Sequence, residues 1–366
     1  MRKNLIYFLL LLLIPAAGIM QTSDKLHISS VSLHSHVENR GQILDTMTLV
    51  LDDPSSAELL SASDFDLYAE IRWTDRSFHS VPSELCYTPQ GLVLCFAGMP
   101  ETWNETAWWR VTCSDSRFSF GKTDITEDHV DVADDFKRFS PYNEDWSPTG
   151  EAFDYSIYTP KNTGKPLPLV LVLHGSGDFD ILRSGRQALC FAEPEFQQKH
   201  PCYVLVPYFQ EATLLSNDEV LSAAKEKITS MIQEGLLDPS RIYVTGLSMG
   251  GWNAFLLLTR YSEESFFAAG ILLCPWLDRT LTTPEIERAV NTPLWVLYGE
   301  RDTVVPNPGE IADRLVSMGS SLCKCTVYRT EEFEAEGISS QHAVDLLALR
   351  DDSLREWLLA QRLDLK

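Results

Sequence analysis

Short apolar runs alternating with helical segments are the feature that most constrains the fold of the second half of this chain. A run of Val, Ile and Leu without polar alternation is typical of a strand buried on both faces of a parallel sheet. Six such runs lie at residues 166–173, 202–207, 241–245, 269–274, 294–298 and 324–329. Strands that alternate with helices predict a mostly parallel sheet with helices on both faces.

The helical segments between the runs carry ordinary start and stop signals. Ser216 and Glu219 resemble a capping box, and Gly235 is placed to end the helix that follows them. The apolar residues of this segment recur with helical spacing. Further helices are expected after residue 248, over 309–318 and over 352–361.

The first half of the chain has a different pattern. It contains short strand-like runs with turn signals between them and no long helical pattern. The clearest runs are residues 46–51, 65–73, 92–96 and 107–113. They predict a small all-β sandwich of immunoglobulin type over residues 24–125. The acidic residues 126–135 are interpreted as a linker, and residues 136–366 as the α/β domain.

The N-terminus has the layout of a secretory signal peptide. Arg2 and Lys3 precede an apolar run, and small residues follow at Ala16, Ala17 and Gly18. We therefore predict a signal peptide over residues 1–18 and export to the periplasm, the cell surface or the medium. The alternative is a retained anchor, although the apolar run is shorter than the roughly 20 residues that usually span a bilayer.

The charge of the chain bears on its partners. The formal net charge is −22 at pH 7. A field of this sign repels nucleic acid and anionic membrane surfaces, so we expect neither as a partner. The sequence has no other long apolar run, so we expect no membrane insertion once the signal is removed. The oligomeric state stays open.

The chain has eight cysteines, and an exported protein can form disulfides. The pairs Cys86–Cys95 and Cys190–Cys202 are both candidates, since the sequence does not give the connectivity. Cys274 ends an apolar run and is expected to be a small buried hydrophobe. Cys323 and Cys325 lack the second pair of ligands that a structural metal site needs, so no metal is predicted.

One short motif indicates the chemistry. Residues 246–250 read Gly-Leu-Ser-Met-Gly, between a predicted strand and a predicted helix. The G-x-S-x-G pattern in this context is that of a nucleophile elbow, with Ser248 raised above the sheet. The alternative is a structural serine in a tight turn.

A serine hydroxyl needs a base, and the base needs an acid to orient it. His342 is the one histidine that follows Ser248, and it lies in a polar segment before the last helix. Asp302 lies just past the strand at residues 294–298, where the acid of such a triad belongs. Glu300 is the nearest competitor for the same role.

Attack on a carbonyl also needs hydrogen-bond donors for the developing oxyanion. We assign this role to the backbone N–H groups of Met249 and Ser176. His174, which precedes Ser176, is interpreted as a brace for that loop. Trp276 is a candidate for lining the acyl pocket, with core packing as the alternative.

The residues also carry a family resemblance. It rests on residues 237–251 (LDPSRIYVTGLSMGG), 173–177 (LHGSG), the segment from Tyr298-Gly299 through Asp302 to Pro306, and 356–361 (EWLLAQ). This stretch resembles secreted bacterial serine esterases of the α/β-hydrolase superfamily, in the branch of prolyl-oligopeptidase-like and polyhydroxybutyrate-depolymerase-like enzymes. The resemblance implies ester hydrolysis without metal or cofactor. Some members carry an N-terminal immunoglobulin-like domain. Gln341 before the histidine and Ala343 after it depart from the usual pattern, which leaves the substrate open.

We therefore expect a serine carboxylesterase that hydrolyses short-chain acyl or aryl esters through an acyl-enzyme. The substrate would be a small molecule or an ester attached to a polysaccharide. Two alternatives remain: a serine peptidase of prolyl-oligopeptidase-like type, and a surface carbohydrate-binding protein with a vestigial hydrolase domain.

Overall fold

The computed structural model describes residues 28–364 with short gaps. The gaps are residues 39–40, 58–59, 72–76, 98, 100–105, 116–117, 122–126, 131–134, 144, 162–163, 177–180, 210–216, 263–264, 278–280 and 351. The predicted signal peptide lies outside the described residues. Among the helices that are described, none has the length and apolar character needed to cross a membrane.

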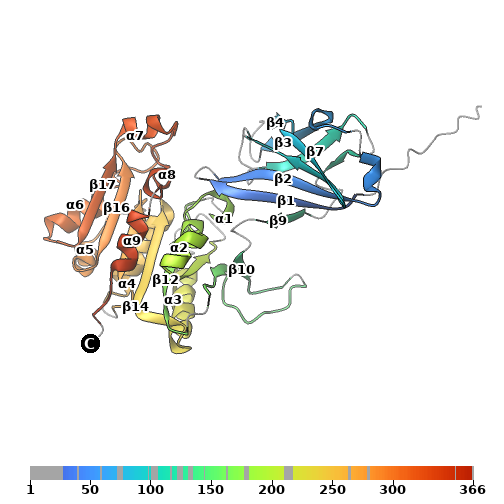
Figure 1. Ribbon diagram of the computed structural model, residues 1–366. Helices are drawn as coiled ribbons and strands as arrows, with labels where there is room; N and C mark the ends of the chain where they lie inside the picture. The colour runs from blue at the N-terminus through green and yellow to red at the C-terminus, as the bar shows by residue number, and fades with distance from the viewer. Residues whose placement is uncertain are drawn as a thin grey trace, which may run out of the picture.

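A large mixed sheet forms the second half of the chain (Figure 1). Its strand order is β10-β11-β13-β12-β14-β15-β16-β17. The β10–β11 and β11–β13 pairs are antiparallel, and the pairs from β13 to β17 are parallel. The strands are β10 (Phe136–Phe139), β11 (Tyr155–Tyr158), β12 (Leu167–Leu173), β13 (Tyr203–Pro207), β14 (Leu237–Leu247), β15 (Ala269–Leu273), β16 (Leu294–Gly299) and β17 (Cys323–Tyr328).

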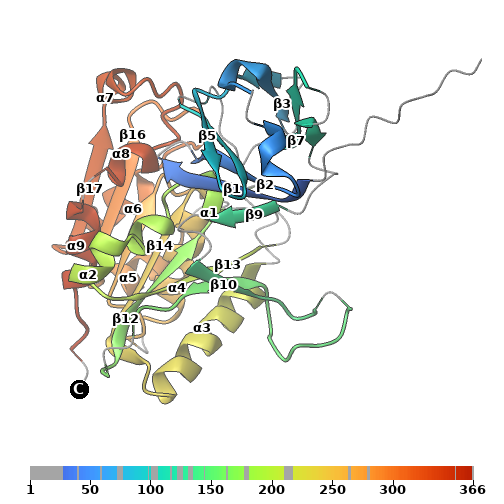
Figure 2. The same ribbon diagram turned by 45° about the vertical axis from the view of Figure 1, so that its right-hand side comes forward.

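Helices cover both faces of this sheet (Figure 2). The strand β12 shows why, because Leu171 and Leu173 contribute to one core while Val170 and Val172 contribute to the other. The first core includes residues of α3 (Asn217–Gln233), α4 (Met249–Arg260), α5 (Thr283–Ala289) and α6 (Glu310–Ser317). The second includes residues of α1 (Ile181–Ser184), α2 (Pro194–Lys199), α8 (Asp345–Ala348) and α9 (Ser353–Ala360). The predicted α/β-hydrolase architecture is therefore confirmed.

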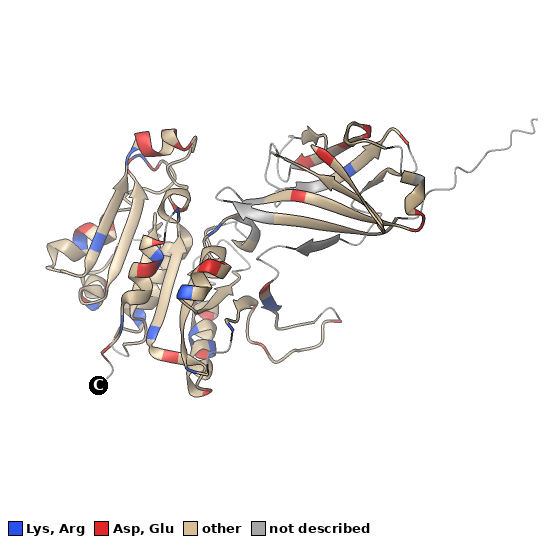
Figure 3. Ribbon diagram, viewed as in Figure 1, with Lys and Arg blue, Asp and Glu red and all other residues tan. Residues whose placement is uncertain are grey.

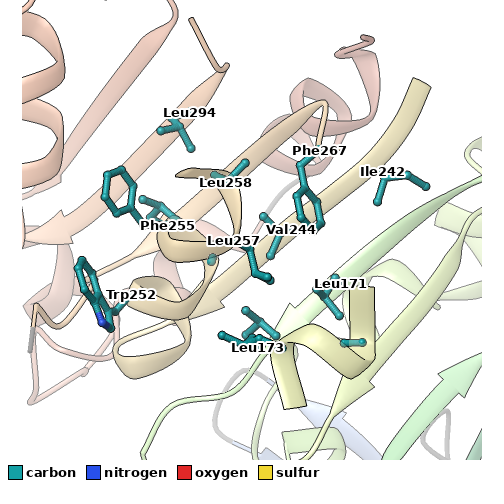
Figure 4. Packing of buried hydrophobic residues seen from close by; sticks show 14 of the residues in the cluster. Leu171, Leu173, Ile242, Val244, Trp252, Phe255, Leu257, Leu258, Phe267 and Leu294 are labelled. Atoms are coloured by element: carbon teal, nitrogen blue, oxygen red, sulfur yellow. The ribbon is translucent and has the colours of Figure 1, made fainter. Parts of the chain in front are cut away.

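Helix α4 is the most deeply buried of the helices that position the site. Trp252, Phe255 and Leu257 on this helix belong to one buried cluster with Leu173 and Val244 of the sheet (Figure 4). Ten of its twelve residues are buried, so its start is fixed firmly against the strands.

Two smaller sheets form the first half of the described chain and share one hydrophobic core. The first has the order β5-β6-β2-β1-β9 and the second β4-β3-β7-β8. The strands are β1 (Ile28–Glu38), β2 (Gly41–Leu51), β3 (Phe65–Ile71), β4 (Ser77–Ser80), β5 (Glu84–Thr88), β6 (Gly91–Cys95), β7 (Thr106–Cys113), β8 (Phe120–Gly121) and β9 (Glu127–Val130). Strand β2 lies against α1 of the larger part (Figure 1).

Two segments differ from the sequence-based expectation. Strand β9 lies within residues 126–135, which were interpreted as a linker; it pairs in parallel with β1 at the edge of the sheet. No helix was among those expected between β15 and β16, but helix α5 forms there. Its N-cap Thr282 and Glu285 make a capping box, and a helix of seven residues is too short for apolar periodicity to reveal.

All eight cysteines lie among the described residues and are free thiols. Neither of the candidate disulfides is formed. Cys86 lies opposite Val93 and Cys95 opposite Glu84, so the two cysteines are diagonal neighbours. Such positions are roughly 7–8 Å apart at their Cα atoms, beyond the usual reach of a disulfide. Burial raises the pKa of Cys190 and of Cys202 to about 12, so both are neutral thiols.

Acidic and basic residues are interspersed along the ribbon (Figure 3). The excess of Asp and Glu is spread over helices and loops of both parts of the chain.

Candidate active site

Ser248 occupies a sharp turn between β14 and α4. Its backbone angles are φ 57° and ψ −116°, a conformation that a residue with a side chain rarely adopts. The Ser248 carbonyl accepts hydrogen bonds from the N–H groups of Trp252 (3.1 Å) and Trp276 (3.0 Å). Strain of this kind persists where the surrounding structure enforces it, and it is common at functional sites.

Two glycines make this turn possible. A Cβ atom on Gly246 would lie 2.3 Å from the carbonyl oxygen of Gly250. A Cβ atom on Gly250 would lie 2.0 Å from the carbonyl oxygen of Leu173 on the neighbouring strand. Both contacts involve backbone atoms, so no side-chain movement relieves them. The two glycines of the motif are therefore required for the close approach of α4 to β12 and β14.

The Gly250→Ala variant is expected to lose about 3–5 kcal/mol of unfolding free energy, because the added methyl group overlaps the backbone of β12. Urea unfolding followed by circular dichroism measures this loss. Gly185→Ala is the matched control, since the nearest atom to its added Cβ is 3.9 Å away. We expect the control to stay within about 0.5 kcal/mol of wild type. Equal midpoints for the two variants would contradict the close approach.

His342 and Asp302 form a hydrogen-bonded pair. The distance from His342 Nδ1 to Asp302 Oδ2 is 2.8 Å. The Asp302 side chain is fully buried, and that of His342 is 19% exposed. Since the carboxylate accepts at Nδ1, it favours the tautomer with the proton on Nδ1 and leaves Nε2 as a proton acceptor.

The other carboxylate oxygen fixes the orientation of Asp302. Oδ1 accepts the backbone N–H groups of Val304 (2.8 Å) and Val305 (3.1 Å). The loop after β16 thus turns around the carboxylate and aims its second oxygen at the imidazole. A carboxylate that is held in this way can orient a histidine and stabilise its cation.

Glu300, the competing acid, takes a different position. Its Oε1 accepts the backbone N–H of Thr330 (2.9 Å) and its hydroxyl (2.8 Å). These hydrogen bonds, the backbone one first, lower the pKa of Glu300. Glu300 therefore anchors the loop at the start of α7 (Thr330–Ala335), and the structure pairs Asp302 with the histidine instead.

Ser248 and the His342–Asp302 pair lie at the same edge of the large sheet. β14, β15 and β16 are neighbouring parallel strands, and Ser248, Cys274 and Asp302 follow their carboxyl ends. Cys274 connects them: its backbone N–H donates to Leu297 (2.7 Å), and its thiol donates to the His342 carbonyl (3.2 Å). Ligands of open α/β sheets bind beyond this edge.

Gln341 connects the histidine loop to the acid loop. Its Oε1 accepts the backbone N–H of Arg301 (2.7 Å), and its Nε2 donates to Thr330 Oγ1 (2.9 Å). A Cβ atom on Gly299 would lie 2.7 Å from Gln341 Cβ, so the two loops are in close contact. Gln341 thus has a structural role, since it links the two loops.

The loop after β12 lies beside Ser248. A Cβ atom on Gly175 would lie 3.8 Å from Ser248 Cβ, and the Ser176 side chain is exposed. The buried His174 braces this loop, because its Nδ1 contacts the Gly175 carbonyl (2.7 Å) and its Nε2 accepts the N–H of Phe209 (3.0 Å). Gly177, the next residue of the predicted oxyanion loop, lies outside the described residues.

Met249 and Trp276 flank Ser248 in different ways. Met249 is buried and begins α4, which directs its backbone N–H toward the turn. Trp276 is half-buried and packs against the first core of the large sheet. Its backbone N–H donates to the Ser248 carbonyl, so Trp276 lies next to Ser248 and also takes part in the packing of the sheet.

Sequence reasoning missed the contacts of Cys274 and Gln341. Cys274 is buried, as predicted, but its thiol is also a donor beside the histidine. The sequence contained only a weak signal for it, namely its position directly after a strand at the carboxyl edge. For Gln341, adjacency to His342 was the available signal.

Comparison with known proteins establishes the fold. No protein-family model and no curated protein sequence matches the chain. The crystal structure of a thermostable esterase is similar with a TM-score of 0.69 and 23% sequence identity, over 92% of this chain and 100% of that one. The chain thus has the α/β-hydrolase fold, and the similarity extends over most of the N-terminal sheets as well.

More distant similarities were also found among solved structures. A Pyrobaculum calidifontis esterase has a TM-score of 0.42 and 14% identity, over 63% of this chain and 88% of that one. A thermophilic carboxylesterase cloned from a metagenomic library has a TM-score of 0.41 and 17% identity, over 61% and 85%.

Proposed function

We propose that this protein is a serine carboxylesterase that hydrolyses short-chain acyl or aryl esters through an acyl-enzyme. Ser248 is the nucleophile, His342 the general base and Asp302 the acid that orients the base. The observation that carries the proposal is the 2.8 Å hydrogen bond between His342 and a fully buried Asp302, at the sheet edge where the strained Ser248 lies.

The chemistry follows from this arrangement. His342 Nε2 takes the hydroxyl proton of Ser248 as the oxygen attacks the ester carbonyl. The imidazolium is stabilised by Asp302 and returns the proton to the departing alcohol. Water then attacks the acyl-enzyme by the same route and restores Ser248. Each step uses side chains and backbone amides of this chain.

The oxyanion would be bound by two backbone N–H groups. We assign them to Met249, at the first position of α4, and to Ser176, in the loop that His174 braces. Donors fixed in advance need no reorganisation when the charge develops, which is why such groups lower the barrier. Trp276 is proposed to line the acyl side of the site.

The setting of the enzyme is part of the same proposal. A signal peptide over residues 1–18 would export the chain, and residues 24–125 would form an immunoglobulin-like domain before the catalytic one. The substrate would be a small ester or an ester attached to a polysaccharide. An uncharged substrate suits the net charge of −22, which disfavours polyanions.

Matched ester and amide substrates test the reaction class. We expect p-nitrophenyl butyrate to give a burst of p-nitrophenol equal to the enzyme concentration, because acylation precedes slower deacylation. We expect kcat/KM for this ester to exceed that for a p-nitroanilide peptide by at least about 100-fold, a difference of some 2.7 kcal/mol. Faster cleavage of the amide would favour the peptidase alternative instead.

A further inference from the structure

Cys274 places a sulfur atom beside the histidine and the acid of the site. The Cys274 sulfur, a carboxylate oxygen of Asp302 and a ring nitrogen of His342 lie within 4.8 Å of one another. The thiol is completely buried and donates to the His342 carbonyl at 3.2 Å. The reaction described above makes no use of this sulfur.

These three groups are the ligand types that bind soft divalent cations. Thiolate, imidazole and carboxylate all coordinate Zn²⁺, at distances of about 2.0–2.3 Å. Sites with three protein ligands leave a fourth position open. Since sulfur and nitrogen ligands discriminate against Mg²⁺ and Ca²⁺, the set selects a thiophilic cation.

We propose that Cys274, Asp302 and His342 form an inhibitory site for a thiophilic divalent cation such as Zn²⁺ or Cd²⁺. The inference rests on the proposed function, because inhibition requires His342 to be the catalytic base. The cation is an inhibitor here and takes no part in ester hydrolysis.

The proton balance explains why the bound cation would stop the reaction. The Cys274 thiol releases its proton to water, and the thiolate and the Asp302 carboxylate neutralise the two charges of the cation. Nδ1 of His342 becomes a ligand, and the ring proton moves through solvent to Nε2. With a proton on Nε2, the imidazole cannot accept the proton of Ser248.

Burial determines how the cation would enter. The side chains of Cys274 and Asp302 are fully buried, while that of His342 is 19% exposed. The cation therefore approaches from the imidazole side and must displace the hydrogen bond between His342 and Asp302. We expect inhibition to develop over time rather than at once, and a chelator to reverse it.

One other group of potential ligands provides an internal control. Within the described residues, Glu84, Cys86 and Cys95 also place their ligand atoms within 4.8 Å of one another. They lie on β5 and β6 of the smaller sheets, far along the chain from Ser248. A cation bound there should leave the esterase reaction unaffected.

The test measures p-nitrophenyl butyrate hydrolysis by the full-length protein after incubation with Zn²⁺ or Cd²⁺, relative to the metal-free rate of each variant. Cys274→Ala and Cys274→Ser should need at least about 100-fold more cation than wild type for the same inhibition, since a ligand is lost. Cys86→Ala should be inhibited like wild type, and Mg²⁺ should not inhibit. Equal inhibition of wild type and both Cys274 variants would overturn the proposal.

A second readout is independent of esterase activity. Cd²⁺ bound to a thiolate absorbs in the ultraviolet, so wild type should show a larger Cd²⁺-dependent absorbance than Cys274→Ser. If wild type shows this absorbance difference but hydrolyses no ester, the proposed function is overturned and the metal site is supported. Absence of the difference, in variants that unfold with the same thermal midpoint as wild type, would overturn the site itself.

Discussion

Replacing Ser248 by alanine is expected to lower kcat for p-nitrophenyl butyrate by about 10⁵- to 10⁶-fold, the loss typical of removing a serine nucleophile. The residual rate would come from the backbone donors and substrate binding alone. Stopped-flow and long-term steady-state assays together cover this range. Because alanine keeps the Cβ atom and with it the same backbone constraint at φ 57°, the variant should fold about as stably as wild type.

The matched control for this variant is Ser262→Ala. Ser262 follows the far end of α4, where its hydroxyl donates to the Thr259 carbonyl. We expect its kcat to stay within about twofold of wild type, because Ser262 lies beyond the end of α4 opposite to Ser248 and its hydroxyl contacts only the last turn of that helix. Comparable rates for Ser248→Ala and wild type would show that another residue is the nucleophile.

Replacing Asp302 by asparagine is expected to lower kcat by about 10⁴-fold. The amide keeps an oxygen for the N–H groups of Val304 and Val305 and turns its NH₂ group toward His342 Nδ1. That contact requires Nδ1 to be unprotonated, so the proton moves to Nε2 and the base is lost. Steady-state kinetics measure the loss, and KM should change little.

Glu300→Gln provides the control for Asp302→Asn. Both changes remove one carboxylate from the same loop, but Glu300 is bonded to Thr330 and not to the histidine. We expect kcat of Glu300→Gln to stay within about threefold of wild type, because the loss of an exposed charged contact has a small energetic effect. If Glu300→Gln lost as much kcat as Asp302→Asn, the assignment of Asp302 as the acid would be wrong.

Much of the larger fold could be predicted because its strands are buried on both faces. A continuous apolar run such as Leu167–Leu173 can be buried on both faces in few structures other than a central parallel strand. The longer helices followed from apolar spacing, and α3 ends before Gly235, whose φ is 74°. The short helix α5 and the edge strand β9 were not predicted from the sequence. Neither is long enough for its apolar pattern to be distinguished from a random one.

The candidate site could be predicted in part for a topological reason. The carboxyl ends of adjacent parallel strands meet at one edge, so residues after β14 and β16 had to lie near each other. Asp302 was preferred to Glu300 from its position just past the end of β16, and the structure pairs Asp302 with His342 and Glu300 with Thr330. The contacts of Cys274 and Gln341 join segments distant in sequence, and the weak signals in the sequence did not show which residues they contact.

The most direct test of this account is to locate a covalent adduct. The protein is incubated with a fluorophosphonate, digested and analysed by tandem mass spectrometry. The account predicts one adduct on Ser248, formed much more slowly in Asp302→Asn and absent in Ser248→Ala. Full ester hydrolysis with no adduct on Ser248, or with the adduct on another serine, would contradict the assignment of Ser248 as the nucleophile.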